Sequence, residues 1–547
     1  MRKIRIIALC LLLALLLTGC DLSFLKDLNI TAPGNSVISY SDMIYTRPDM
    51  EQFQESLKRC ALEAHRAASI DTLVNELNIF FDLYDSFYTN YALADIRYCA
   101  DLTDSYWTEE YNFCSENTAT VDAALDNLYR MLAASPMREM LEQDSYFGED
   151  FFDSYDGESM WDEHFVALLE QESALVNRYY DLSNAARNAE YYSEEYFSVY
   201  GMAMAELFVE LVALRQQIAE DTGFPSYPEY AYMSYYRDYS PQQAVEYMSQ
   251  VGSSLYDIYC NLGQSDAWDA AADYCSDDDT FQYVKDAAAA MGGIAEEAFY
   301  LLELGGLYDI RYGKNKYDIS FETFLWSYWE PFIFMRPQLN QTDKLTFAHE
   351  FGHFAADYAC GGSYAGTDIT EIHSQAFEYL SLCYAPDTES LLRYKMVNSL
   401  NTYVECSAYA MFEHLVYDLT GEDLTVENVL ALYEKIGLQF GFDSWNWDRR
   451  DFVTVGHFFT NPMYTISYVV SNDLAMQFYQ MEIRQPGAGL ELYEQCLTSQ
   501  DSYIIQFAED YGLVSPFAEG HLQTMAETFS SVLQPEEDSN IPIPLAS

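Results

Sequence analysis

Hydrophobic side chains recur every three or four positions along most of this chain, which is the spacing of helices with one buried face. The pattern starts near Met50, continues through residues 165–188 and 192–219, and resumes at Ser240-Pro241, where a serine N-cap precedes a first-turn proline. Residues 331–335 differ, because they form a short β-prone run flanked by prolines, which is typical of an edge strand. We therefore expect a mostly α protein with a small β element.

The first 20 residues have the features of an export signal. Three basic residues precede an apolar run at residues 6–17, which is shorter than the roughly 20 residues that a membrane span needs. The ending Leu17-Thr18-Gly19-Cys20 resembles a bacterial lipobox, in which the cysteine becomes the lipidated first residue. We expect a signal peptide at 1–19 and an extracytoplasmic lipoprotein that is anchored to the bacterial cell membrane through Cys20. The alternative is an ordinary secretory signal.

Composition divides the rest of the chain. Residues 20–49 contain two prolines and a glycine and are typical of an anchor and tether. Residues 50–300 form a helical N-terminal part, and residues 301–533 hold the candidate chemistry described below. Residues 534–547, with three prolines and a short acidic run, are expected to be a disordered tail.

Charge and cysteine content exclude some functions. The chain has 87 acidic and 27 basic residues, and loss of three basic residues with the signal peptide brings the net charge from −60 to −63. Such a surface excludes nucleic acid as a partner. Of the 11 cysteines, Cys10 leaves with the signal and Cys20 takes the lipid. The remaining nine are an odd, scattered set that is not typical of a disulfide framework. Separately, we expect the protein to be a monomer.

The strongest chemical signal is His349-Glu350-Phe351-Gly352-His353, an H-E-x-x-H pattern. Helix positions four apart differ by about 40° and lie about 6 Å from each other, so both histidines can bind one zinc ion. Glu350 is turned by about 100° and can face a water instead. Thr342 is a candidate N-cap of this helix and Gly361-Gly362 ends it.

A zinc hydrolase needs a third protein ligand, and residues 367–378 offer candidates on the next helix. Glu371 and Glu378 are seven positions apart and share a face, so one can bind zinc while the other orients a histidine. In a competing interpretation, Asp368 caps the helix and Glu371 closes a capping box. His373 is a rival ligand, but it faces away from Glu371. We favour Glu371.

Together these residues resemble the thimet oligopeptidase and oligoendopeptidase F family of gluzincin metallopeptidases, whose third ligand sits in a Glu-x-Pro-Ser-Gln motif. Three differences stand out: Ala356 occupies a usual histidine position, His373 replaces the proline, and the step from Gly366-Thr367 to Glu371 is short. Other stretches within residues 200–480 are also similar, namely 211–241, 331–335, 410–413 and 457–468.

The resemblance implies an elongated helical molecule with one Zn²⁺ per chain in a deep channel, of which residues 50–300 form one wall. Such a metalloendopeptidase hydrolyses short unstructured oligopeptides, with Glu350 as general base on a zinc-bound water. The metal ligands would be His349, His353 and Glu371, with Glu378 behind them. The resemblance also implies that His457 and Tyr468 donate to the oxyanion, and that Phe332, Ile333, Phe334 and Tyr464 contact the substrate.

Other functions are compatible with the same sequence features. A metallocarboxypeptidase would carry the same motif but release single residues from the C-terminus. A non-catalytic peptide-binding lipoprotein would share the signal and the groove without needing Glu350, and a purely structural lipoprotein would bind no stoichiometric zinc.

Overall fold

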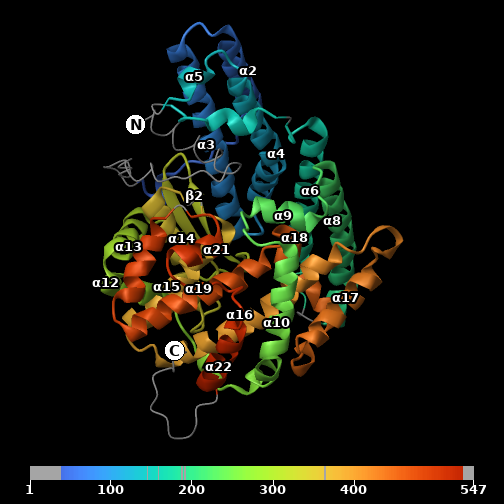
Figure 1. Ribbon diagram of the computed structural model, residues 1–547, viewed down its shortest axis with the longest axis vertical. Coiled ribbons are helices and arrows are strands. Elements are labelled where there is room, and N and C mark those ends of the chain that lie inside the picture. The colour runs from blue at the N-terminus through green and yellow to red at the C-terminus, as the bar shows by residue number, and fades with distance from the viewer. Residues whose placement is uncertain are drawn as a thin grey trace. The chain divides into compact units, whose positions relative to one another are not determined.

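The structure is a computed structural model that describes residues 38–143, 146–157, 159–186, 189, 193–362, 365–499 and 501–533 (Figure 1). The expected signal peptide, the lipidation site Cys20, most of the tether and the tail at 534–547 lie outside the described residues. The chain divides into two compact units. The first contains Met1–Asn177, Asn315–Tyr317 and Thr323–Phe332, and the second contains Arg178–Lys314, Asp318–Glu322 and Ile333–Ser547. The division expected at residue 300 stays a prediction.

The first unit is a helical bundle built on three long helices, α2 (Met50–Arg66), α3 (Ile70–Ala100) and α4 (Ser105–Ala133). Its core contains the apolar positions that the periodicity indicated, among them Leu57, Leu77 and Phe80. Each such side chain contributes roughly 1.5–3 kcal/mol when it is fully buried. The shorter elements of this part are α5 (Arg138–Leu141), the 3-10 helix η3 (Phe151–Tyr155) and the start of α6 (Glu163–Ala186).

The second unit is also helical, and α15 (Thr367–Tyr384) lies at its centre. α15 packs along α14 (Asp343–Cys360) and α19 (Thr465–Arg484), and α16 (Glu389–Val416) packs against α19 and α10 (Pro241–Cys260). The remaining α-helices among the described residues of this unit are α7 (Glu194–Tyr196), α8 (Met202–Asp221), α9 (Tyr227–Ser234), α11 (Ala267–Ala271), α12 (Asp277–Met291), α13 (Gly293–Gly305), α17 (Val426–Gln439), α18 (Gly456–Thr460), α20 (Ala488–Leu497), α21 (Ile504–Asp510) and α22 (His521–Leu533). The prediction of a mostly α fold is therefore confirmed.

One helix among the described residues, Phe197–Asp221, is long and apolar enough to span a membrane, and it includes α8. Half of its most apolar window is buried inside the protein. Arg215 on this helix is fully buried and donates to the backbone carbonyls of Phe458 (2.8 Å) and Phe459 (2.6 Å). These contacts are those of a core helix, which passes the same length and composition test.

The small β element has three strands, β1 (Tyr308–Asp309), β2 (Ser320–Leu325) and β3 (Glu330–Met335), in the order β1-β3-β2. β3 is therefore the central strand, and the expectation of an edge strand was wrong. β1 runs parallel to β3 and pairs with it only at Ile333 and Phe334. The missing N–H of Pro331 thus leaves no bond to β1 unmade, which is why a proline is tolerated there.

The correction also affects the residues expected to contact the substrate. Phe332, Ile333 and Phe334 are fully buried. A central strand that is covered on both faces has a continuous run of apolar residues. A short apolar run between prolines is therefore compatible with a central strand as well as with an edge strand. The role in peptide binding that the resemblance implies for these three residues stays a prediction.

Candidate metal centre and active site

α14 carries the H-E-x-x-H residues and is fixed at both ends. The carboxylate of Asp343 accepts hydrogen bonds from the backbone N–H groups of Gln338 (2.9 Å) and Asn340 (3.2 Å). Thr342 was expected to cap the helix, but its side chain makes no capping bond. Its hydroxyl donates to the Asn340 side chain instead. The helix ends at Gly361, whose left-handed backbone (φ +69°) glycine adopts without strain.

Gly352 allows α14 and α15 to approach each other closely. A Cβ atom at this position would lie 2.5 Å from the Cα of Ser374 and 2.6 Å from the carbonyl oxygen of His373. Both of those atoms belong to the backbone of α15, so no side-chain movement could make room. The close approach brings Glu371 on α15 next to the two histidines of α14.

His349, His353 and Glu371 form a compact group of possible metal ligands. One donor atom from each lies within 4.8 Å of the others, and this is the one such group found among the described residues. His349 Nε2 is 3.4 Å from Glu371 Oε2, and the two imidazole rings are 5.0 Å apart between centroids. His373, the rival ligand, is buried outside this group, and Tyr493 of α20 donates to its carbonyl oxygen.

The competing interpretation of Glu371 as a capping residue does not fit the structure. The N-cap position of α15 is Gly366, and no side chain caps the helix there. The carboxylate of Asp368 instead accepts from the Ser467 hydroxyl (2.5 Å) and lies 3.5 Å from Arg237 Nε. Glu371 is therefore available to the histidines.

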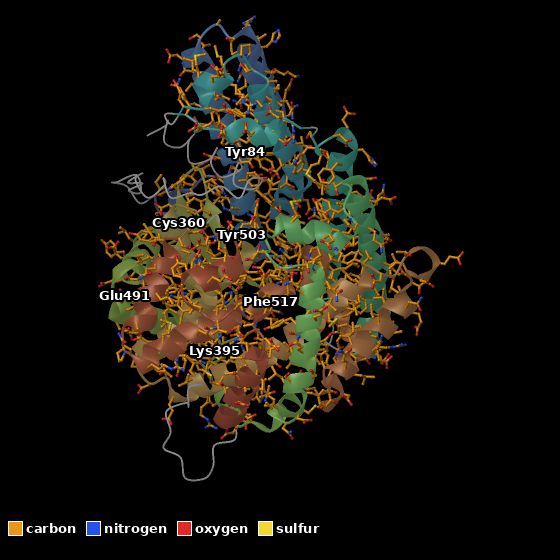
Figure 2. The ribbon with its side chains drawn as sticks, viewed as in Figure 1. Tyr84, Cys360, Lys395, Glu491, Tyr503 and Phe517 are labelled. Carbon is orange, nitrogen blue, oxygen red and sulfur yellow. The ribbon has the colours of Figure 1, made fainter. Side chains whose placement is uncertain are left out.

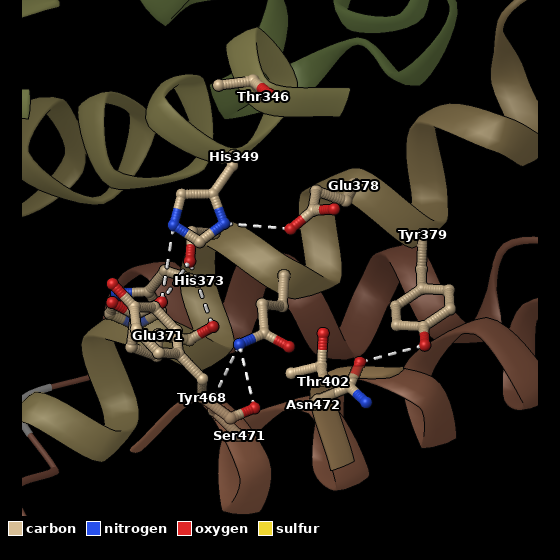
Figure 3. Close-up of polar contacts among 12 residues, drawn as sticks. Thr346, His349, Glu371, His373, Glu378, Tyr379, Thr402, Tyr468, Ser471 and Asn472 are labelled. Carbon is tan, nitrogen blue, oxygen red and sulfur yellow. Dashed lines mark hydrogen bonds and ion pairs between the residues drawn. The ribbon is translucent and has the colours of Figure 1, made fainter. Parts of the chain in front are cut away.

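Glu378 orients His349 from behind. Its Oε1 is 2.9 Å from His349 Nδ1, which turns Nε2 of the same ring toward Glu371 (Figure 3). The other oxygen of Glu378 accepts from the ammonium of Lys395 at 2.8 Å (Lys395 is labelled in Figure 2). Burial alone would raise the pKa of Glu378, but Lys395 and His349 hold it below its usual value. A carboxylate on the far nitrogen is the usual partner of a metal-binding histidine.

The carboxylate of Glu371 has two further partners. The Tyr464 hydroxyl donates to its Oε1 at 2.5 Å, and the Ser374 hydroxyl donates to its Oε2 at 3.2 Å. Only 1 % of Glu371 is exposed, and burial raises its pKa. The two hydroxyls thus hold the carboxylate toward His349.

Glu350 follows His349 on α14 and is a buried carboxylate. It is 6 % exposed, and burial raises its pKa to about 7 although the charge of His349 opposes the shift. A base with a pKa near neutrality can take up and release a proton efficiently at physiological pH. The two histidines differ: burial lowers the pKa of His353, whereas for His349 burial is outweighed by Glu378 and Glu371, and its pKa rises to about 9.

His457, Tyr464 and Tyr468 form a cluster that contacts Glu371 through the Tyr464 hydroxyl. Their rings lie 5.3–5.6 Å apart between centroids, and His457 Nε2 is 3.1 Å from the Tyr468 hydroxyl. Burial lowers the pKa of His457 to about 4 and raises the pKa of Tyr468 well above its usual value, so both side chains are neutral at pH 7. The structure thus brings together the residues that the sequence indicated separately, but their roles stay predictions.

The group fits a zinc ion by its chemistry. Two imidazoles and one carboxylate are a usual ligand set of catalytic zinc sites. Glu350, Glu371 and Glu378 are all buried, and the ammonium of Lys395 pairs with only one of them. A divalent cation between His349, His353 and Glu371 would balance the remaining negative charge, which is costly to bury alone.

Sequence reasoning missed Lys395 and the contact between Tyr464 and Glu371. A single lysine in a helical pattern usually faces solvent, so no local signal separates Lys395 from its neighbours. Tyr464 was expected to contact the substrate, and 93 positions separate it from Glu371. Only the packing of α19 against α15 brings the two together.

Comparisons with known proteins support a peptidase. Residues 40–159 match the family described as Peptidase M3 N-terminal domain, and they lie within the first unit. A search of curated proteins found no match to the chain.

Solved structures share the fold across nearly the whole chain. A structure of a candidate oligoendopeptidase F is 21 % identical, covers 91 % of this chain and 99 % of its own, and has a TM-score of 0.78. A structure of PZ peptidase A with an inhibitor is 19 % identical, with 91 % and 100 % coverage and a TM-score of 0.77. A candidate oligoendopeptidase F from Bacillus anthracis is 20 % identical, with 92 % and 99 % coverage and a TM-score of 0.74. At these identities the likeness shows the fold alone, and together with the family match it supports an M3-family peptidase.

Proposed function

We propose that the protein is a zinc-dependent metalloendopeptidase that hydrolyses short, unstructured oligopeptides. The observation that carries this proposal is the group of His349, His353 and Glu371, with donor atoms within 4.8 Å, and Glu350 beside it on α14. Three protein ligands leave a fourth position open for water or substrate. The M3 N-terminal match and the shared fold support the same class of enzyme.

Glu350 performs the proton transfers in the proposed mechanism. Zinc held by His349, His353 and Glu371 would polarise the scissile carbonyl and lower the pKa of water. The Glu350 carboxylate takes the proton of the attacking water and then delivers it to the departing amine. Its position one residue after His349 places it beside the ligands rather than among them.

Tyr468 and His457 are the proposed donors to the oxyanion that forms when water attacks the carbonyl carbon. Tyr468 keeps its proton because burial raises its pKa, and the neutral imidazole of His457 carries one N–H. The two side chains are hydrogen-bonded to each other, and each carries one proton, so this bond must open before both can donate to the oxyanion. One donor of this type is typically worth about 10²–10³ in rate.

The place of action is a separate proposal that rests on the sequence of residues 1–20. The lipobox-like end at Cys20 would attach the mature chain to the outer face of the cytoplasmic membrane, where oligopeptides are its substrates. Cys20→Ser should abolish lipidation and membrane association. If that variant still partitions with membranes, the lipid anchor is excluded.

Incubation with a mixed peptide library and mass spectrometry of the products tests the reaction. We expect internal cleavage of short peptides that a zinc chelator stops and added zinc restores. Release of single C-terminal residues would identify a carboxypeptidase instead. Binding of peptides without any cleavage would identify the non-catalytic alternative.

Two substitutions distinguish the proposed role of Glu350 as a base from that of Glu371 as a metal ligand. Glu350→Gln removes the base but no ligand, so zinc should stay near one equivalent per chain while turnover collapses. Glu371→Gln replaces an anionic ligand by a weaker neutral one, so zinc affinity should fall and added zinc should restore part of the activity. Elemental analysis and peptide hydrolysis measure both. If Glu371→Gln keeps its zinc while Glu378→Gln loses it, the ligand assignment is wrong.

A further inference from the structure

A strained turn connects α18 to α19 and sets the positions of Tyr464 and Tyr468. Met463 in this turn has a left-handed backbone (φ +66°), a conformation that residues with a Cβ atom adopt only when their surroundings impose it. The turn closes with a hydrogen bond from Tyr464 N to the carbonyl oxygen of Asn461 (3.2 Å). Residues 461–464 are called the catalytic turn below.

Two charged side chains bind both backbone groups of Met463. The carboxylate of Glu413 accepts from Met463 N (2.6 Å) and from the Thr465 hydroxyl (2.5 Å). The guanidinium of Arg237 donates to the Met463 carbonyl oxygen (2.8 Å) and to the Ser467 hydroxyl (2.9 Å). The left-handed residue is therefore held at its N–H by Glu413 of α16 and at its C=O by Arg237, which lies between α9 and α10.

Glu413 and Arg237 are both buried, so the cost of removing their charges from water has to be offset by specific contacts. Glu413 is 2 % exposed, and burial raises its pKa to about 7 although Thr465 and Met463 N stabilise the carboxylate. The Arg237 side chain is enclosed by the rings of Tyr232 (4.5 Å) and Tyr235 (4.9 Å). The Asp368 carboxylate, 3.5 Å from Arg237 Nε, offsets part of the cost of burying the guanidinium, and the remaining polar contacts of Arg237 are with Met463 and Ser467.

The same contacts lead to the metal ligands. Tyr464, which ends the catalytic turn, donates its hydroxyl to Glu371 Oε1 at 2.5 Å. Ser467, which accepts from Arg237, donates to Asp368 on α15, three residues before Glu371. A change in the turn would therefore move the Tyr464 hydroxyl and the start of α19 relative to α15.

We propose that Arg237 and Glu413 are positioning residues that hold the catalytic turn in its left-handed conformation and so place the hydroxyls of Tyr464 and Tyr468 beside Glu371. This inference rests on the proposed function where it concerns catalysis. The positioning itself can be measured in the metal-free protein, which separates a failure of this inference from a failure of the proposed function.

Glu413→Gln tests the effect on catalysis. The amide offers one acceptor oxygen in place of a carboxylate, so either Met463 N or the Thr465 hydroxyl loses its strong partner. We expect kcat to fall by at least about 10-fold with KM within about 3-fold, as for the loss of an interaction made in the transition state. Zinc should stay at one equivalent, because no ligand is changed. Glu405→Gln is the matched control on α16, since its carboxylate bonds Asn401 and Tyr259 instead, and its kcat should stay near that of the wild type.

A double-mutant cycle in the metal-free protein tests the positioning without any activity measurement. Tyr464→Phe removes only the hydroxyl that donates to Glu371. If Glu413 positions this hydroxyl, Glu413→Gln already weakens the same bond, and the double variant should lose less Tm than the two single losses combined. Losses that add up fully would overturn the proposal. Tyr464→Phe combined with Glu405→Gln should be additive.

Thr465→Val is the second route if Glu413→Gln does not fold. It removes one donor to Glu413 and keeps the charge, so the same non-additivity with Tyr464→Phe should appear at smaller size. Additivity in this cycle as well would contradict the proposal. A wild-type protein that cleaves no peptide would refute the proposed function and leave the result of the metal-free cycle intact.

Discussion

Gly352→Ala should disrupt the proposed metal site although it adds only a methyl group. The added Cβ would lie 2.5 Å from the Ser374 Cα and 2.6 Å from the His373 carbonyl oxygen. The lower limit of ordinary Cβ contacts is 3.4 Å, so the backbone of α15 would have to move away from α14 by about 0.9 Å. This movement separates Glu371 from the two histidines.

Two opposing effects decide the stability of this variant. Alanine is favoured over glycine in a helix by about 1 kcal/mol. Overpacking of a core costs about 1–3 kcal/mol or more, and the upper part of this range applies because backbone atoms cannot rotate away. We therefore expect a net loss of about 1–2 kcal/mol in the free energy of unfolding.

The effect on zinc should be larger than the effect on stability. Metal–ligand distances tolerate deviations of only about 0.2 Å, and a 0.9 Å displacement of one ligand relative to the other two exceeds this limit several times. We expect the Kd for zinc to rise by about 100-fold, which is at the upper end of what the loss of a ligand-orienting contact causes.

Competition with a chelating dye measures the Kd for zinc, and urea denaturation measures stability. Gly252→Ala on α10 is the matched control, because it is also a buried helical glycine. Its new Cβ would meet the Phe440 ring at 3.0 Å, which is a side chain that can shift. The control should leave the zinc affinity unchanged. A Kd for Gly352→Ala within about 3-fold of the wild-type value would refute the argument from helix spacing.

Three further predictions concern single contacts. Lys395→Met leaves Glu378 without its buried cation, so zinc should bind about 10-fold more weakly in a chelator competition, and an unchanged Kd would contradict this. Tyr468→Phe should lower kcat by about 10²–10³ in a peptide assay while KM and zinc content stay constant, and a loss below about 3-fold would exclude it as an oxyanion donor. His521 pairs with the buried Asp473, and although burial lowers the His521 pKa, this bond raises it overall. A histidine with a raised pKa adds stability that is full below its unfolded pKa of about 6.5 and is lost as pH rises through the folded pKa. His521→Gln should therefore shift the urea midpoint more at pH 6 than at pH 9, and equal shifts at both would refute this.

The parts of the site that lie on one helix could be predicted from sequence. His349, Glu350 and His353 are separated by at most one turn, so helix geometry alone places them on neighbouring faces. The prediction of Glu371 as third ligand needed an assumption about how the next helix crosses α14. The structure supports the grouping because Gly352 removes the side chain that would keep the helices apart.

The errors concern neighbours that are distant in sequence. Residues 331–335 have the composition of a strand, but whether such a strand lies at the edge or at the centre depends on where β1 and β2 pair. Thr342 has the residue type of an N-cap, yet its backbone is already helical (φ −67°, ψ −26°) and its hydroxyl donates to Asn340. In both cases the local pattern is compatible with two structures, and the packing of other segments selects one.

The polar positions of α15 show why periodicity cannot distinguish an active site from a solvent-exposed face. Asp368, Glu371, Gln375 and Glu378 recur at three and four positions, which is the pattern of a helix side that faces water. All four are buried, because this stripe meets α14, α16 and α19 instead of solvent. Each has a polar partner on another helix, such as Ser471 for Gln375 and Lys395 for Glu378. A helix with an apolar side and a polar stripe is therefore a surface helix only if the rest of the chain leaves that stripe uncovered. Here the cover includes the groups that contact the candidate metal ligands.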